Sequence, residues 1–239
     1  MMPHKYEKVK LQMWYTSDDD RSLDFIKDLG EYVRPMVDGS LISATHSLEF
    51  VPKFVHYACP HCDSDFKRKN CVSDGQYCAM QKSFQQNLSG REVIQEHLRQ
   101  YCIYDILDKK NQADKFFDYI AHVHQLCESR ITERCSTLGI QSVQLTFEEV
   151  SGCVRGTFAG SGESVARLEE ENSVLAEMLK SWNEYGSHLY PSVVINDFTF
   201  RGQLNPFNVF EAVCASFEQE PKACKRWLKK EGIKLDDQP

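Results

Sequence analysis

The sequence of 239 residues is 41% hydrophobic and 26% charged, a composition typical of a globular chain that can bury a core. A formal net charge of -7 and an isoelectric point near 5.6 argue against binding to nucleic acid or anionic membranes, which requires a basic surface. No apolar run approaches the roughly 20 residues that span a bilayer, and the first residues lack the apolar segment of an export signal. We therefore expect a globular chain without a membrane span and without a nucleic-acid partner.

The ten cysteines lie mostly in the middle of the chain, and their even number favours a disulfide framework formed in an oxidising lumen. Asn87 begins the triplet Asn-Leu-Ser, a potential N-glycosylation site. The alternative is a cytosolic protein whose cysteines stay reduced and pack as small apolar side chains. We favour a luminal protein whose export signal lies outside this chain.

The first predicted elements form a βαβ unit. Residues 9–16 alternate between apolar and polar as a strand does, and the acidic stretch after them suits the start of a helix. Residues 22–33 place apolar side chains on one helical face, and Pro35 with Gly39 is expected to end that helix. Residues 40–51 read as a second strand.

Helical periodicity dominates the middle of the chain. Ser89 and Glu92 have the spacing of a capping box at the start of a long helix. Residues 112–127 and 131–139 continue in helical rhythm, and Gly139 is expected to end the last of these helices.

A further helix is predicted over residues 163–186. Its apolar positions recur at alternating steps of three and four, with one asparagine among them: Val165, Leu168, Asn172, Leu175, Leu179 and Trp182. This spacing resembles a short coiled-coil seam. We favour an amphipathic helix that covers the sheet and ends at Gly186, because the pattern lasts only about three heptads, the minimum for a coiled coil.

The last third of the chain contains a β-hairpin and a closing helix. Residues 192–195 and 198–202 read as short strands joined by a tight turn at Asn196 and Asp197. The closing helix has Asn205 as its N-cap and a proline in its first turn, Pro206. The residues predicted to face inward are Val209, Phe210, Val213 and Phe217.

A βαβ unit, a proline-led hairpin and a helix follow one another in the order of the thioredoxin fold. We therefore predict an α/β, thioredoxin-like fold with a cysteine-rich helical insertion, and Pro191 as the cis-proline usual before the third strand of that fold. The predicted core is discontinuous, residues 5–51 and 163–220, with the insertion at 52–162 and a C-terminal tail at 221–239. The basic residues of the tail, which we interpret as a solvated helix face, are Lys222, Lys225, Arg226, Lys229 and Lys230.

Cys59-Pro60-His61-Cys62 raises the question of redox chemistry. The same motif occurs in strongly oxidising DsbA-like enzymes, and lysosomal thiol reductases offer a second luminal comparison. In thioredoxin-like enzymes, however, the two cysteines lie between the first strand and the first helix, where the helix dipole lowers the pKa of the attacking thiol. Residues 16–21 occupy that position here and contain no cysteine. We favour a structural pair over a catalytic one.

No metal or other cofactor is expected. The cysteines that could form a zinc site are Cys59, Cys62, Cys71 and Cys78, with His56 and His61 nearby. The second cysteine pair is spaced too widely for a usual structural zinc site. His122 and His124 would project to different sides of a helix and would not converge on an ion.

The cysteine-rich segments resemble the central luminal domain of vacuolar sorting receptors. The stretches that carry the resemblance are HYACPHC, CVSDGQYCA, SGREVIQEHLRQYCIY, FFDYIAHVHQLC, CSTLGI and YPSVVINDFTFRGQLNPFNVFEAVCASFEQEPKAC. They follow in that order from about residue 50 to Cys224, and the most specific are the Cys71 to Cys78 segment and LRQYCIY. The resemblance implies a thioredoxin-like fold with a helical insertion.

The resemblance also implies a function. Vacuolar sorting receptors are type I membrane proteins that bind sorting peptides on soluble cargo and carry them from the Golgi to the vacuole. We therefore expect a luminal cargo-sorting module of the secretory pathway whose partner is a soluble cargo protein or peptide. The sequence leaves open whether the module is a fragment of a larger membrane receptor or a soluble relative of such receptors. The alternative is a luminal thiol-disulfide oxidoreductase that uses Cys59 and Cys62. A binding module is favoured over an enzyme.

A peptide would bind at the open backbone edge beside the cis-proline, where an extended chain can add by β-augmentation. The predicted peptide-binding residues are Asp18, Asp19, Asp20, Tyr190 and Pro191, with Trp14 as a further apolar contact. The three aspartates would favour a peptide with a basic residue. Cys214 and Cys224 are predicted to form a disulfide, because they are close in sequence and isolated from the other cysteines.

Overall fold

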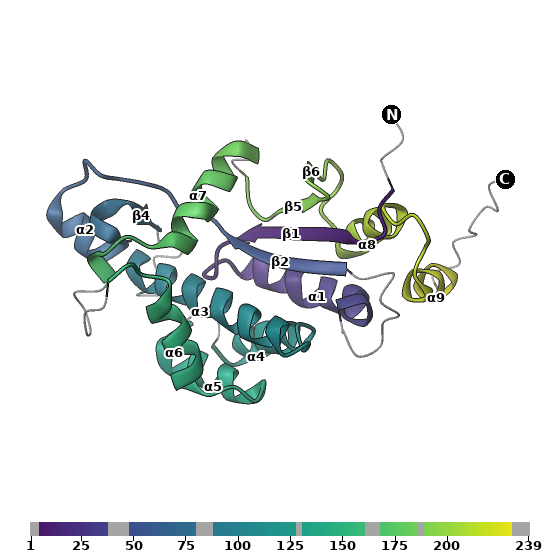
Figure 1. Cartoon of the computed structure of the whole chain (residues 1–239), viewed down its shortest axis with the longest axis horizontal. Coiled ribbons are helices and arrows are strands. Elements are labelled where there is room, and N and C mark those ends of the chain that lie inside the picture. The colour runs from purple at the N-terminus through teal and green to yellow at the C-terminus, as the bar shows by residue number, and fades with distance from the viewer. Residues whose placement is uncertain are drawn as a thin grey trace.

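The central feature of the computed structural model is a four-stranded mixed sheet with the strand order β2-β1-β5-β6 (Figure 1). The structure describes residues 5–37, 48–79, 88–127, 131–160, 168–185 and 189–230. The strands are β1 (Val9–Tyr15), β2 (Leu48–Phe54), β5 (Ser192–Ile195) and β6 (Phe198–Thr199). The sheet thus joins strands from the two ends of the chain, as the thioredoxin-like prediction requires. The predicted domain boundaries stay predictions.

Strand β1 lies at the centre of the sheet and pairs on both sides. It runs parallel to β2, from Val9 opposite Leu48 to Tyr15 opposite Phe54, with helix α1 (Asp20–Val37) as the crossover. It runs antiparallel to β5, from Leu11 opposite Ile195 to Trp14 opposite Ser192. The predicted βαβ unit is confirmed.

Helix α1 includes Pro35 and reaches Val37, so Pro35 does not itself end the helix, although the last described helical residue lies between Pro35 and Gly39, as predicted. A proline inside a helix deletes one backbone N–H and with it one helical hydrogen bond, a cost that other interactions of the helix must offset. Met36 and Val37 follow the proline and are both buried in the core, which favours the extra helical residues. Gly39 lies outside the described residues.

The hairpin and closing helix agree with the prediction. Asn196 and Asp197 both have positive φ, 46° and 67°, as the central residues of a tight hairpin turn between β5 and β6 require. Helix α8 (Pro206–Ala215) begins after Asn205, whose side chain accepts hydrogen bonds from the backbone of the first turn. The peptide bond between Tyr190 and Pro191 is cis.

The middle of the chain contains most of the helices and a small second sheet. Its elements are α2 (Ser64–Asn70), β3 (Cys71–Val72), the short 3-10 helix η1 (Ser73–Gly75), β4 (Tyr77–Cys78), α3 (Gly90–Lys109), α4 (Lys115–Cys127), α5 (Glu133–Ser142) and α6 (Phe147–Gly156). The capping box of Ser89 and Glu92 starts α3 as predicted. Within the described ranges, no helix combines the length and apolarity needed to cross a membrane.

Helix α5 runs past Gly139 to Ser142, which corrects the prediction that this glycine ends it. A Cβ atom at Gly139 would lie 2.8 Å from Val123 Cγ1 and 2.9 Å from Tyr119 Cε2. Glycine is therefore required here because α4 and α5 pack closely, a cause that the local sequence does not display.

Helix α7 (Ser173–Tyr185) is shorter than predicted, and the coiled-coil interpretation is wrong. Asn172 lies outside the helix and caps it, because its Oδ1 accepts the N–H of Leu175 at 2.9 Å. Leu168 precedes the helix, while Val165 and Gly186 lie outside the described residues.

The two faces of β1 contact different helices, because successive side chains of a strand point to opposite faces. Leu11, Met13 and Tyr15 belong to the main core, which also contains side chains of α1, α3 and α4. Trp14 points the other way and packs against Trp182 of α7, with ring centroids 5.2 Å apart. In Figure 1, α4 lies on the far side of the strands from α7, whereas the first turn of α7 packs against α3, where Leu175 shares a small core with Val93 and Leu98. The preferred interpretation of α7, an amphipathic helix covering the sheet, holds for its Trp182 end, whereas Leu175 and Leu179 pack in the small core around Tyr77.

Helix α9 (Lys222–Lys230) lies in the predicted C-terminal tail. Cys224 in α9 is bridged to Cys214 in α8, and the ring of Trp227 packs 4.9 Å from that of Tyr32 in α1. This part of the tail is therefore attached to the core.

Candidate functional site

The turn between β1 and α1 occupies the position of the redox cysteines in thioredoxin-like enzymes, and here it is a closed polar turn. Asp18 and Asp19 are only 5% and 8% exposed, whereas Asp20 is exposed. Thr16 Oγ1 donates to Asp18 Oδ1 at 2.5 Å, and Ser22 Oγ donates to Asp19 Oδ2. Two of the three aspartates predicted to bind a peptide thus accept hydrogen bonds within the turn.

A buried histidine of α3 lies beneath this turn. His97 Nε2 accepts the backbone N–H of Ser17 at 3.1 Å, and its ring stacks on Phe54 with centroids 4.9 Å apart. Burial lowers the pKa of His97 well below its usual value, and the neighbouring His56 lowers it further. A neutral ring is also what the Ser17 bond requires, because a protonated Nε2 cannot accept a hydrogen bond.

The cis-proline loop lies at the same end of the sheet as the turn. The last pair of β1 and β5 is Trp14 with Ser192, so Pro191 and Tyr190 continue alongside the end of β1. Tyr190 is half-buried against the cluster that contains Trp14. Trp14 itself is fully buried and presents no apolar surface to a peptide. The peptide-binding role of Asp18, Asp19, Asp20, Tyr190 and Pro191 stays a prediction.

All ten cysteines are paired. The bridges are Cys59–Cys62, Cys71–Cys78, Cys102–Cys153, Cys127–Cys135 and Cys214–Cys224. Cys59 and Cys62 are both partly exposed, whereas each of the other bridges contains at least one buried cysteine. The four cysteines weighed as zinc ligands are all in disulfides, which leaves no thiolate for a metal. In the part of the chain that the structure describes, no other group of His, Cys, Asp and Glu is arranged to hold one.

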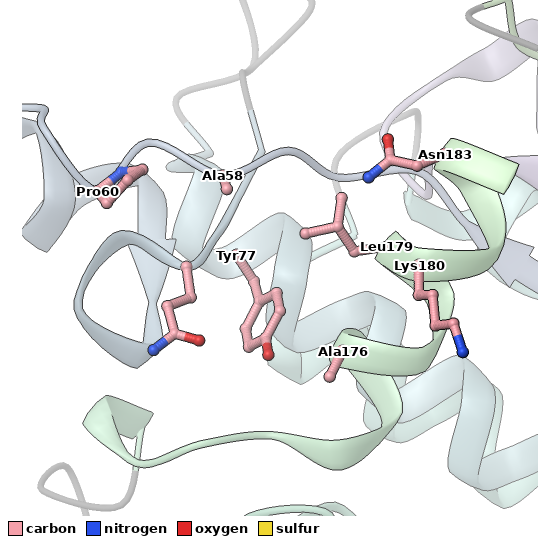
Figure 2. Close-up of a pocket in the computed structure, with 8 residues that line it drawn as sticks. Ala58, Pro60, Tyr77, Ala176, Leu179, Lys180 and Asn183 are labelled. Atoms are coloured by element: carbon pink, nitrogen blue, oxygen red, sulfur yellow. The ribbon is translucent and has the colours of Figure 1, made fainter. Parts of the chain in front are cut away.

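A pocket of about 340 Å³ opens beside the Cys59–Cys62 loop (Figure 2). It is lined by Ala58, Pro60, Gln76, Tyr77, Ala176, Leu179, Lys180 and Asn183. Three segments that are distant in sequence meet here: the Cys59–Cys62 loop, the start of β4 and one side of α7. Figure 2 shows Leu179 of α7 between Asn183 and Tyr77, below the backbone that carries Ala58.

The loop wall of the pocket is fixed by backbone pairing to β4. Tyr57 and Cys78 exchange hydrogen bonds of 3.0 and 2.7 Å, and Cys59 N–H donates to Gly75 O at 2.8 Å. Gly75 has a φ of 88°, and a Cβ atom there would lie 2.8 Å from Cys59 O. A glycine is therefore needed for the close approach of the two segments.

The inner side of the pocket is a small core of its own. Tyr77 and Leu175 pack in a cluster separate from the main core, with Leu179 partly buried against it. His56 is buried behind them, where its Nε2 donates to Leu175 O at 2.9 Å and its ring meets Tyr77 edge-on. Burial lowers the pKa of His56 to about 4. This histidine therefore links the loop after β2 to the first turn of α7.

The fold and the turn define a thioredoxin-like protein that has no cysteine at its first strand-helix turn. The family described as the vacuolar sorting receptor thioredoxin-like domain matches residues 9–214. The chain belongs to this family. The predicted glycosylation site, Asn87, lies outside the described residues.

Curated relatives agree with this family. The chain is 26% identical over 237 residues to vacuolar-sorting receptor 7 of Arabidopsis thaliana, with 93% of this chain and 36% of the relative covered. It is 24% identical over 238 residues to vacuolar-sorting receptor 1 of Pisum sativum, with the same coverage of both chains. The chain thus spans little more than a third of the length of these relatives.

Two solved structures are more distantly similar. A putative protein-disulfide isomerase from Pseudomonas syringae shares 8% identity at a TM-score of 0.45, covering 89% of this chain and 97% of that one. The oxidoreductase DsbA from Xylella fastidiosa shares 9% identity at a TM-score of 0.43, covering 90% of each chain.

Sequence reasoning missed the pocket. The α7 side of the pocket is predictable in part, because Leu175, Leu179 and Trp182 have the spacing of one helical face. The other walls depend on the pairing of Tyr57 with Cys78, which brings the Cys59–Cys62 loop against β4. No local pattern in the sequence indicates that pairing.

Proposed function

We propose that this chain is a luminal cargo-sorting module that binds sorting peptides of soluble proteins on the route from the Golgi to the vacuole. The observation that carries the proposal is the family match over residues 9–214. The five disulfides are consistent with a lumen, since such bridges persist in oxidising compartments. We infer the binding of cargo from membership of this family.

The proposed peptide surface lies at the end of the sheet, beside the cis-proline loop. Asp20, Tyr190 and Pro191 are at least partly exposed there, whereas Asp18 and Asp19 shape the turn from inside. Direct contact with a peptide is therefore proposed through the first three, and an indirect effect through the other two.

The test is calorimetry with the oxidised chain and a synthetic sorting peptide from a soluble vacuolar protein, with a scrambled peptide as the control. We expect binding of the sorting peptide alone. Substitution of Asp20→Asn is expected to weaken binding of a peptide that carries a basic residue and to reduce its salt dependence. Equal heats for the two peptides would contradict the proposal.

A thiol-disulfide oxidoreductase is the second candidate, and the partial exposure of Cys59 and Cys62 favours it. A substrate thiolate would attack one sulfur of this disulfide, form a mixed disulfide and release the other sulfur as a thiolate. A second thiolate of the substrate would then attack the substrate sulfur of the mixed disulfide and release the bound cysteine as a thiolate. The substrate is then oxidised and the Cys59–Cys62 pair reduced. The absence of a thiol at the turn between β1 and α1 argues against this candidate.

Oxidation of a model dithiol peptide separates the two candidates. For a binding module, we expect the wild-type chain to be no faster than a variant in which Cys59 and Cys62 are both replaced by serine. A rate comparable to that of a disulfide oxidoreductase, lost in the double variant, would favour the enzyme.

A further inference from the structure

We propose that the pocket between the Cys59–Cys62 loop and α7 binds a bulky apolar side chain of an extended cargo peptide, together with a carboxylate on the same face of that peptide. The inference rests on the proposed function, because it names the peptide chemistry that such a module would select. It places the selective contact at this pocket, a surface separate from the predicted residues at the end of the sheet.

The walls of the pocket suit an apolar side chain. Ala58, Pro60, Tyr77, Ala176 and Leu179 supply carbon surface from three directions. A volume of about 340 Å³ is at the small end of the range for ligand pockets and accommodates a side chain rather than a large cofactor. The pocket is backed by buried apolar residues, so its shape is set by packing rather than by loose loops.

The loop wall offers a backbone edge to an extended chain. Tyr57 and Cys59 direct their hydrogen bonds to the β4 side, at Cys78 and Gly75. Ala58 lies between them, and in extended backbone the N–H and C=O of alternate residues point to opposite sides. Its main-chain groups therefore face away from β4, and among the residues that the structure describes they have no backbone partner. A peptide can add to this edge as a short strand.

The charge on the lining selects a carboxylate. Lys180 is the one ionic residue among those that line the pocket. Its Nζ lies 3.8 Å from Glu184 Oε1, with both side chains largely exposed, an ion pair that contributes little in water. A peptide carboxylate at the pocket entrance can therefore replace Glu184 at little cost. Gln76 and Asn183 offer amide groups to the peptide backbone.

The probes are short fluorescent glycine-serine peptides with leucine and aspartate at alternate positions, which an extended chain places on one face. Matched probes replace the aspartate by lysine or the leucine by alanine. We expect the leucine-aspartate peptide to bind best. Either replacement should weaken binding about tenfold, the effect of one good contact.

Two variants test the site. Ala176→Phe fills the pocket and should weaken the leucine-aspartate peptide about tenfold or more. Lys180→Glu reverses the charge at an exposed position, so it should weaken the aspartate probe and strengthen the lysine probe. Lys229→Glu makes the same charge change at an exposed position of α9 and should change the binding of neither probe. Circular dichroism and thermal melting check folding. If Ala176→Phe does not fold, the exchange of preference in Lys180→Glu still decides the question.

The outcomes separate this inference from the proposed function. A sorting peptide that binds equally well to wild type, Ala176→Phe and Lys180→Glu would overturn the pocket and leave the proposed function standing. Binding of the leucine-aspartate probe with the exchanged preference, but no binding of any sorting peptide, would support the pocket and overturn the function. A wild-type dimer that Ala176→Phe converts to a monomer would make a second copy the occupant and overturn the inference.

Discussion

Two buried histidines, His56 and His97, fix the loops at one end of the sheet by hydrogen bonds. Both rings are neutral when they do so. His56 donates to the backbone of α7 through Nε2, and His97 accepts the backbone of the turn after β1. Thr16 Oγ1 lies 2.5 Å from Asp18 Oδ1 and 3.3 Å from His97 Nε2. Both rings are buried, so protonation of either one places a charge in a site shielded from water.

Stability is expected to fall with acid. The pKa of His56 is lowered from 6.5 to about 4 by burial, so the unfolded chain binds the additional proton between these values. The free energy of unfolding should therefore decrease as the pH falls from about 6.5 to about 4, by on the order of 3 kcal/mol from His56. His97 adds a loss of the same sign. Urea denaturation across this pH range measures it.

Matched variants identify the source of this pH dependence. His56→Gln should flatten the pH dependence even if it lowers stability at neutral pH, because the titrating group is gone. His61→Gln changes an exposed histidine and should leave the slope unchanged. A slope that stays the same in a double variant of His56 and His97 would count against this explanation.

Glu96 is the centre of a second buried polar group. Its carboxylate accepts hydrogen bonds from Arg99 Nε at 2.8 Å, Gln100 Nε2 at 2.9 Å and Tyr119 Oη at 2.7 Å. The Glu96 side chain is 2% exposed and that of Arg99 10%, so the pair is shielded from water. The segment 98–104, which carried part of the family resemblance, thus includes residues with structural roles in the interior.

Removal of this carboxylate should be severe. Glu96→Ala leaves the guanidinium of Arg99 buried without its close partner, and we expect a loss of about 3 to 5 kcal/mol in the free energy of unfolding. Glu133→Ala is the control, because Glu133 is exposed and lies 3.8 Å from the same arginine, so the loss should stay below about 1 kcal/mol. Equal effects of the two substitutions in guanidinium denaturation would contradict the role given to Glu96.

At the scale of the elements, the glycines of the helical region have different roles. Gly139 lies where α4 and α5 pack closely, whereas the nearest atom to a Cβ at Gly152 in α6 would be 3.7 Å away. Gly139→Ala should therefore destabilise the chain by about 1 to 3 kcal/mol through overpacking. Gly152→Ala should stabilise it by up to about 1 kcal/mol through helix propensity. Thermal unfolding of both variants tests the contrast, and a stable Gly139→Ala protein would show that the two helices can separate.

The elements that the sequence predicted well are those with local causes. The turn at Asn196 and Asp197, the cap at Asn205 and the capping box at Ser89 each depend on neighbouring residues. Pro35, by contrast, remains in a helix because the residues after it are buried by distant parts of the chain.

The candidate site was less predictable than the fold. The sequence placed the turn after β1 beside the cis-proline loop, but it gave no sign that Asp18 and Asp19 point inward, because charged residues are usually exposed. The burial of these side chains follows from the turn geometry and from His97, which belongs to a helix far along the chain. The pocket depends in the same way on three distant segments.

At the scale of the whole molecule, the bridge Cys102–Cys153 joins α3 to α6 across 51 residues, whereas Cys59–Cys62 closes a loop of three. Loop entropy predicts a stabilisation of about 4 kcal/mol for the first bridge and less than about 2 for the second. Replacement of Cys102 and Cys153 by alanine should therefore lower the melting temperature much more than replacement of Cys59 and Cys62.

Mass spectrometry after alkylation checks the starting state of that experiment. The folded wild type should incorporate no label, and the reduced, unfolded chain should incorporate ten. A smaller effect of the long bridge than of the short one would show that residual structure in the unfolded chain outweighs loop entropy.

The position of β1 has a consequence for synthesis on the ribosome. Tyr15 ends this strand, but the partner that covers its second edge begins only at Ser192. At about 5 to 20 residues per second, roughly 10 to 35 seconds of translation separate the two. The cysteines from Cys59 to Cys153 have all emerged before then, so the helical region can acquire its bridges first. The nascent chain meanwhile exposes an apolar strand edge, the kind of surface that aggregates and that chaperones shield.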